Sequence, residues 1–147
     1  MIYKEEVRDL FSVPDDYYLA HCISADYALG AGIAVEFNKR FDMRRKLHKI
    51  WPDCWIYMIS HDLDGDCLLI DNVLNLITKE KYYHKPTYYT MHQALYMMKV
   101  VCEYNNIKKV AMPLIGCGLD RLKWDRVSQM IKDIFADTDI EILVCKR

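Results

Sequence analysis

The sequence has few of the residues that interrupt regular secondary structure: five glycines and four prolines in 147 residues. They do not gather into a linker or a low-complexity tract, and no segment repeats. The chain therefore predicts one domain, residues 1–147, rather than several domains joined by flexible connections. With 52% hydrophobic and 28% charged residues, its composition is that of a globular protein and not of a disordered one.

Strong net charge is also absent. The formal net charge is -1 at neutral pH, which excludes a general electrostatic attraction to nucleic acid or to membranes. No stretch is apolar enough to span a bilayer, and the charged segment from Met1 to Glu6 does not fit a signal peptide. We therefore expect a protein without a membrane partner that functions in the cytoplasm, or in the nucleus of a eukaryotic cell.

The cysteines lack the spacing of a zinc site, because no Cys-x-x-Cys pair or matching histidine pair is present. A chain of this length does not need disulfides to stabilise its core. We expect reduced, mostly buried thiols, and we expect neither a metal nor a cofactor. The cysteines are Cys22, Cys54, Cys67, Cys102, Cys117 and Cys145.

Short apolar runs alternate with longer amphipathic segments, a pattern that predicts an α/β domain. Two of the runs flank Asp71-Asn72 and are expected to form a hairpin with a tight turn there. Pro113 has no N–H group for a ladder, so the strand that contains it must end or bulge nearby. Strands are expected at 17–23, 54–59, 67–70, 73–77, 110–115 and 140–144.

Three helices are predicted. The first follows Gly32, and the second begins near Pro86, a residue that suits the first turn of a helix. The third has the clearest periodic signal, since apolar residues recur at i, i+3, i+4, i+7 and i+8 from Val127 to Phe135. These apolar stripes are expected to face the core rather than a ligand.

Two Gly-x-Gly loops each follow a predicted strand: Gly30-Ala-Gly32 and Gly116-Cys-Gly118. Glycine allows positive φ and a close approach to a ligand, and the N–H groups of such a loop can cradle a phosphate. Both loops lie at carboxyl ends of strands, where open α/β sheets bind ligands, so a pyrophosphate fits between them. Each loop alone is also explained as a tight turn, and neither is a Walker A or complete dinucleotide-binding motif.

Ionisable residues stand beside these loops. Asp120, two positions after Gly118, is either a helix cap or a general base beside bound phosphate. Lys79 and Lys81 follow a predicted strand and are either exposed lysines or, for one of them, a nucleophile. The residue types alone leave both alternatives open.

Three further segments contain polar residues, and the last two of them have two interpretations each. His21 and Ser24 lie at the end of a buried strand, where a histidine is usually a core residue with satisfied hydrogen bonds. The run from His84 to Tyr88 is either a pocket wall or the start of a helix. The basic cluster at 39–49 is either a solvated helix face or a contact to nucleic-acid phosphates.

Together these segments resemble the macro-domain family, and within it the terminal ADP-ribose protein glycohydrolase branch. The resemblance extends over nearly the whole chain, and the run from Gly116 to Leu122 followed by Trp124 is especially specific. The joint presence of Lys79 and Asp120 is specific too, because most macro domains lack that pair. The matching strings are residues 9–11, 20–24, 30–34, 76–79, 84–88 and 116–120.

This resemblance implies a three-layer α/β/α fold, in which helices sandwich a mixed central β-sheet, and a catalytic pair of Lys79 and Asp120. Lys79 is favoured over Lys81 because the family lysine directly follows Ile-Thr. The resemblance also implies contacts to adenine, to the distal ribose and to the pyrophosphate. The implied substrate-binding residues are Asp9, Leu10, His21, Ser24, Gly30, Ala31, Gly32, Ile33, Ala34, Thr78, Pro113, Ile115, Gly116, Cys117, Gly118 and Leu119.

The activity implied by the resemblance is removal of mono-ADP-ribose from a conjugate: a protein Glu or Asp ester, O-acetyl-ADP-ribose or a nucleic-acid base. Lys79 would attack the anomeric carbon of the distal ribose, or its opened aldehyde, with Asp120 as base. The partners implied are ADP-ribose and ADP-ribosylated protein or nucleic acid, and the protein is expected to be a monomer.

Three alternatives remain open. The first is a non-catalytic ADP-ribose reader, which would need neither Lys79 nor Asp120. The second is an antitoxin-like enzyme that strips ADP-ribose from DNA, for which the basic cluster at 39–49 is the only support in the sequence. The third is a phosphatase that acts on ADP-ribose phosphate in the same pocket.

Overall fold

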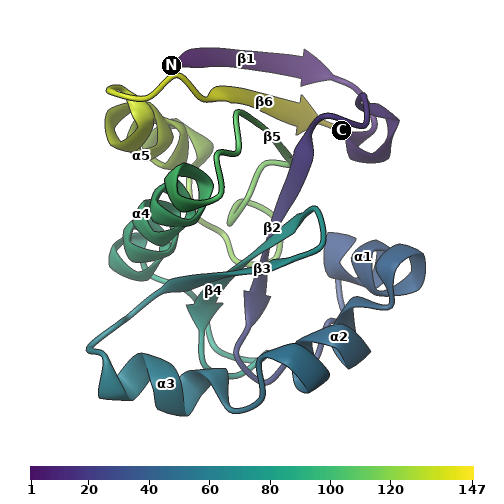
Figure 1. Cartoon of the computed structure of the whole chain (residues 1–147), viewed down its shortest axis with the longest axis vertical. Helices are drawn as coiled ribbons and strands as arrows, with labels where there is room; N and C mark the ends of the chain where they lie inside the picture. The colour runs from purple at the N-terminus through teal and green to yellow at the C-terminus, as the bar shows by residue number, and fades with distance from the viewer.

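The computed structural model describes residues 1–147 and is built around one six-stranded sheet (Figure 1). In chain order its strands are β1 (Ile2–Val7), β2 (Tyr18–Ser24), β3 (Asp66–Ile70), β4 (Val73–Lys79), β5 (Lys109–Met112) and β6 (Glu141–Lys146). Their order across the sheet is β1-β6-β5-β2-β4-β3. Every neighbouring pair is parallel except β3 and β4, so the sheet is mixed, as the resemblance implies.

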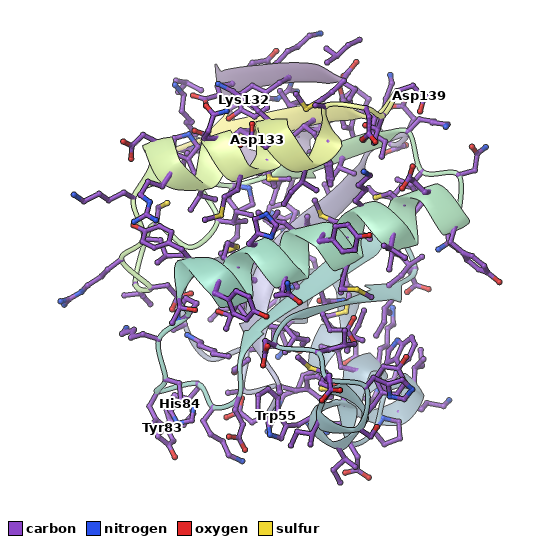
Figure 2. All side chains as sticks on the ribbon, turned by 90° about the vertical axis from the view of Figure 1, so that its left-hand side faces the viewer. Trp55, Tyr83, His84, Lys132, Asp133 and Asp139 are labelled. Carbon is purple, nitrogen blue, oxygen red and sulfur yellow. The ribbon has the colours of Figure 1, made fainter.

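Helices cover both faces of this sheet. They are the 3-10 helix η1 (Leu10–Ser12) and the α-helices α1 (Ile33–Phe41), α2 (Met43–Ile50), α3 (Cys54–Ser60), α4 (Tyr88–Tyr104) and α5 (Trp124–Phe135). Helices α4 and α5 lie side by side on one face, and α1, α2 and α3 pack on the other (Figures 1 and 2). The three-layer α/β/α arrangement is therefore confirmed. No helix combines the length and hydropathy that a membrane span requires.

The alternation of side chains along β4 divides the interior into two cores. Leu74 and Leu76 pack with α4 and α5, whereas Val73 and Ile77 pack with α1, α2 and α3. A strand buried on both faces has to be apolar almost throughout, which explains the run read from the sequence. Each fully buried aliphatic side chain stabilises the fold by about 2 kcal/mol.

The predicted hairpin and the predicted end of β5 are both confirmed. Ile70 pairs with Val73 in the antiparallel β3–β4 ladder, which leaves Asp71 and Asn72 as the turn. Asp71 has a φ of 53°, in the left-handed region that aspartate and asparagine tolerate best after glycine. Strand β5 ends at the residue before Pro113.

The prediction of a strand at 54–59 is wrong, because this segment forms α3. A six-residue apolar run fits either a strand or one and a half turns of helix, and periodicity does not separate the two. Cys54 and Met58, one helical turn apart, are buried, while Ile56 and Ile59 are 66% and 61% exposed. The prediction of three helices also missed α2, and β1 was not predicted because it is a charged and largely exposed edge strand.

Gly65 leads into β3 and lies directly against α4. A Cβ atom on Gly65 would be 2.5 Å from the carbonyl oxygen of Thr90 and 2.6 Å from the amide nitrogen of Ala94. Both are helix backbone atoms, which cannot rotate away as a side chain can. No space therefore remains for any other residue at this position.

We predict that Gly65→Ala lowers the free energy of unfolding by about 2 kcal/mol, measured by urea denaturation, because the backbone must shift to admit the methyl group. Gly118→Ala is the matched control, since no atom lies within 4 Å of an added Cβ there. Equal stability of the two variants would contradict the prediction.

Candidate active site

A cavity of about 850 Å³ opens at the carboxyl ends of four adjacent parallel strands, β6, β5, β2 and β4. Ligands of open α/β sheets bind at this edge, and the volume is in the range of small-molecule sites. Most of the wall comes from the loop between β2 and α1 and from the loop that follows β5. Both Gly-x-Gly motifs thus face one cavity.

The first loop presents a set of free backbone donors. The N–H groups of residues 29–34 donate to no acceptor within the protein, and five of these six residues belong to the glycine loop predicted from the sequence. Gly32 is the N-cap of α1 and has a φ of 61°, a conformation that disfavours a side chain. Unpaired N–H groups at a helix N-terminus form a natural site for a phosphate.

The second loop is braced by its own backbone and also leaves donors free. The Leu122 N–H donates to Gly116 O at 2.7 Å, whereas the N–H groups of Gly116, Gly118, Leu119 and Asp120 have no acceptor in the protein. Gly116 has a φ of 73°, so a residue with a side chain would be strained there. Helix α5 begins only at residue 124, so this loop acts through its own donors and not through a helix end.

Lys79, the last residue of β4, and Asp120, from the loop that follows β5, meet at one end of the cavity. The Lys79 Nζ donates to Asp120 Oδ1 at 2.7 Å, and the two side chains are only 14% and 16% exposed. Asp120 is not a helix cap, because the N-cap of α5 is Lys123. Lys81 lies on the exposed surface, outside the cavity wall. The structure therefore brings together the two residues that the resemblance pairs.

A β-bulge directs Lys79 toward this cavity. In the β2–β4 ladder Ile23 pairs with Ile77, but Ser24 pairs with Lys79, so Thr78 is the additional residue. The Ala25 N–H then donates to Lys79 O at 2.9 Å and extends the pairing past the bulge. Bulges reverse the alternation of side chains and commonly occur beside active sites.

Three cysteines, Cys22, Cys117 and Cys145, also line the cavity. Burial raises the pKa of the Cys22 and Cys145 thiols above the usual range and raises the pKa of Cys117 to about 11. These thiols are protonated at neutral pH and are therefore weak nucleophiles. None of the six cysteines forms a disulfide, and no group of three or more His, Cys, Asp or Glu side chains is arranged to hold a metal ion.

Most of the substrate-binding residues implied by the resemblance line the cavity. The exceptions are Asp9, Leu10, His21 and Thr78, of which Thr78 is buried at the bulge with no hydrogen-bond partner for its hydroxyl. The residues in the wall are Ser24, Gly30, Ala31, Gly32, Ile33, Ala34, Pro113, Ile115, Gly116, Cys117, Gly118 and Leu119.

Asp9 and Leu10 lie next to the cavity rather than in its wall. Asp9 caps η1 by accepting a hydrogen bond from the Phe11 N–H at 3.0 Å, and it forms a 3.4 Å ion pair with Arg147, which does line the cavity. Leu10 is 4% exposed and borders a separate hollow of about 400 Å³. Contact of these two residues with adenine remains a prediction.

His21 is a core residue in this structure. It has no exposed surface, stacks on Phe37 with ring centroids 3.8 Å apart, and has Nε2 2.6 Å from Asn75 Oδ1. The Asn75 amide group donates to Leu68 O, so Asn75 Oδ1 is the acceptor and His21 Nε2 carries the proton. His21 Nδ1 has no partner, and burial lowers the pKa of His21 to about 4. His21 is therefore neutral and supports the strand beneath the cavity.

Several residues in the wall were not predicted from the sequence. Tyr82 comes from the segment after Lys79, as does Lys85 of the 84–88 run, whose Nζ donates to Leu119 O at 2.8 Å and joins that segment to the second loop. Arg147 gives no sequence signal, whereas Cys145 could have been found because it lies at the end of a strand. The remaining unpredicted residues are Cys22, Ile23, Ala28, Leu29 and Leu114.

The structure also shows where the 84–88 run and the basic cluster at 39–49 lie. In the 84–88 run, Lys85 belongs to the cavity wall while Thr87 caps α4 through a reciprocal pair of hydrogen bonds with Thr90, so both interpretations apply. The basic cluster lies on α1 and α2, outside the cavity wall. Its charges are paired in part, since ion pairs join residues 40, 45 and 46 to Glu36, Asp42 and Asp71.

A mixed sheet between two layers of helices, with a nucleotide-sized cavity between two glycine loops, is the architecture of a macro domain. The chain is 41% identical over 140 residues to ADP-ribose glycohydrolase OARD1 of Homo sapiens, covering 92% of this chain and 86% of the relative. The protein of the same name from Bos taurus is 39% identical over the same shares. The chain therefore belongs to the macro-domain ADP-ribose glycohydrolases, the family that its motifs resemble.

Solved structures agree on the fold. The macrodomain of Mycobacterium tuberculosis DarG matches 98% of this chain and 97% of its own with a TM-score of 0.81, at 20% identity. The macrodomain of Thermus aquaticus DarG covers 99% of both chains with a TM-score of 0.78, at 16% identity. No family model matches the sequence.

The depressed pKa of His21 predicts a dependence of stability on pH. An ordinary histidine titrates near 6.5 and folded His21 near 4, so between these values only the unfolded chain binds the proton. The free energy of unfolding should therefore have its full value above pH 6.5 and decrease by about 3 kcal/mol as the pH falls to about 4.

Urea denaturation of wild type and His21→Gln across this pH range measures the effect. Glutamine retains a donor for Asn75 Oδ1 but does not titrate, so the variant should lack this part of the slope. Parallel stability curves for the two proteins would show that His21 is not the group responsible.

Proposed function

We propose that this protein removes mono-ADP-ribose from a conjugate by covalent catalysis, with Lys79 as nucleophile and Asp120 as base. The observation that carries the proposal is the 2.7 Å contact between Lys79 Nζ and Asp120 Oδ1 in the wall of the cavity. The name of the human relative, ADP-ribose glycohydrolase OARD1, supports the activity. Thermosipho africanus DarTG in complex with ADP-ribose shares the fold, with a TM-score of 0.68 at 16% identity over 94% of this chain and 39% of its own.

The strand order favours one orientation of the ligand. Lys79 is the last residue of β4 and Cys145 lies on β6, three strands away in the sheet, which separates the two ends of the cavity by about 14 Å. With the distal ribose at Lys79, the pyrophosphate lies over the free N–H groups of the two glycine loops. The adenosine then extends toward β6 and Arg147.

The proposed chemistry needs only these two side chains and water. Asp120 accepts a proton from Lys79, and the free amine attacks the anomeric carbon of the distal ribose. A carbon–nitrogen bond forms as the bond to the acceptor breaks, and the acceptor leaves with that electron pair and takes up a proton. Water then cleaves the adduct, which releases ADP-ribose and restores the amine. Before hydrolysis the adduct can open its sugar ring to the imine: the bond between the anomeric carbon and the ring oxygen breaks, and the ring oxygen takes up the proton of the adduct nitrogen.

The surroundings of the pair support lysine as the nucleophile. The thiols in the cavity have raised pKa values and are protonated at neutral pH. The carboxylate of Asp120 lies within hydrogen-bond distance of the amine, which is the geometry that a base requires. A module that only binds ADP-ribose has no use for this arrangement, so the structure favours the enzyme over the reader.

We predict that Lys79→Ala slows release of ADP-ribose by about 100-fold or more, because it removes the attacking group. The variant should still bind ADP-ribose in calorimetry, since the loop donors remain. Asp120→Ala should also slow release. Lys81→Ala is the matched control and should keep the wild-type rate, because Lys81 is exposed and outside the cavity wall.

The release assay uses three substrates in parallel: ester-linked protein, O-acetyl-ADP-ribose and base-linked nucleic acid. Borohydride added during turnover should trap an adduct that mass spectrometry places on Lys79. Release without any adduct would favour direct hydrolysis. A wild-type protein that binds ADP-ribose and releases it from none of the three would be a reader.

A further inference from the structure

Asp26 connects the two segments that build the reacting end of the cavity, although it is not part of the cavity wall. Its Oδ1 accepts hydrogen bonds from Ser24 Oγ at 2.5 Å and from the Ala28 N–H at 3.2 Å. Its Oδ2 accepts one from the Tyr82 N–H at 3.0 Å. One carboxylate therefore joins the first glycine loop to residues 80–85, which we call the post-lysine turn.

The backbone of Asp26 takes part in the same connection. The Asp26 N–H donates to Glu80 O at 3.2 Å, next to the 2.9 Å bond from Ala25 to Lys79 O. The loop end of this connection is rigid, because Tyr27 is buried and its hydroxyl donates to Trp51 O at 2.7 Å. Asp26 thus links a fixed loop to the chain that immediately follows the lysine.

The post-lysine turn has little else to hold it in place. The side chains of Tyr82 and Tyr83 are 65% and 67% exposed. Figure 2 shows Tyr83 and His84 together at the outer edge of the molecule, pointing away from its body. Segments with few buried apolar contacts depend on polar contacts for their position. The bond from Tyr82 to Asp26 and the bond from Lys85 to Leu119 are the side-chain contacts that hold the turn against the two loops.

The carboxylate form of Asp26 is the one that this arrangement requires. Burial alone would raise the pKa of Asp26, but hydrogen bonds from Ser24, Tyr82 and Ala28 outweigh that effect and lower it. Two acceptor oxygens, directed at two different segments, are available only in the ionised side chain. If Asp26 only stabilised its own turn, the hydrogen bonds to Oδ1 would be sufficient. The hydrogen bond from the Tyr82 N–H to Oδ2 would then have no explanation.

We propose that Asp26 is a positioning residue for Lys79: it holds the first glycine loop and the turn that directly follows the lysine in one fixed arrangement. A bound nucleotide and the attacking amine then keep their relative position. This inference rests on the proposed function and deepens it. Displacement of a reacting group by 1 Å costs about 100-fold in rate, so a small shift of the turn is enough to matter.

Asp26→Asn tests the proposal with little change in volume. An amide has one acceptor oxygen, so it can satisfy the loop or the post-lysine turn but not both. We expect kcat to fall about tenfold, while KM and the affinity for free ADP-ribose stay close to wild type. Asp137→Asn is the matched control: Asp137 is an exposed carboxylate that pairs with Lys99, and its loss should leave kcat unchanged.

A purely structural role would give a different result. In that case Asp26→Asn would lower Tm and leave kcat unchanged at temperatures well below the transition, and this outcome would overturn the proposal. The double variant Lys79→Ala/Asp26→Asn provides a second test. If Asp26 acts through Lys79, the double variant releases ADP-ribose no more slowly than Lys79→Ala alone, and a further decrease would overturn the proposal.

A crystal structure of Asp26→Asn separates this inference from the proposed function. If the wild type is inactive on all substrates, the proposed function is wrong. The crystal structure alone would then decide whether Asp26 positions Lys79. A Lys79 Nζ to Asp120 Oδ1 distance beyond about 3.5 Å in the variant supports positioning. Retention of the 2.7 Å contact found in the wild type overturns it.

Discussion

The contact between Lys79 and Asp120 is the interaction on which the interpretation of this molecule depends. It joins the end of β4 to the loop that follows β5, although β2 lies between these two strands in the sheet. Removing two charges from water is costly, and a largely buried ion pair contributes little net stability. Folding alone therefore does not explain why the pair lies at the edge where ligands bind. The catalytic role that we propose for an amine beside a carboxylate would account for its place.

The backbone around the pair carries strain of the kind found at functional sites. Tyr27 and Leu29 in the first loop and Arg121 in the second have positive φ without being glycine. Such conformations cost about 1–3 kcal/mol each and persist only where the surrounding structure enforces them. Tyr27 and Leu29 are buried in the core on the α1 side of the sheet, which enforces their conformations. The loops are thereby fixed with their N–H groups free, so they need not reorganise to receive a phosphate.

The sequence predicted the elements whose signals are local. The apolar run of β4, the turn at Asp71-Asn72 and the glycine loops each depend on residues a few positions apart. Segment 54–59 failed because six apolar residues fit two periodicities, and tertiary packing alone selects the helix. The pairing of Lys79 with Asp120 came from the resemblance and not from spacing. The hydrogen bond between Asp26 and Tyr82 joins residues 56 positions apart, and no local sequence pattern predicts it.

The surroundings of the reacting end indicate how a large conjugate reaches the lysine. The Leu119 side chain is 65% exposed and Tyr82 equally so, and both residues line the cavity. Lys85 bridges their two segments through its bond to Leu119 O. The acceptor end of the cavity is thus bordered by solvent-exposed side chains, whereas the lysine and aspartate behind them are mostly buried. In the function proposed above, a conjugate would present its terminal ADP-ribose to the pair while its acceptor stays outside, which is the arrangement that cleavage of a macromolecular substrate requires.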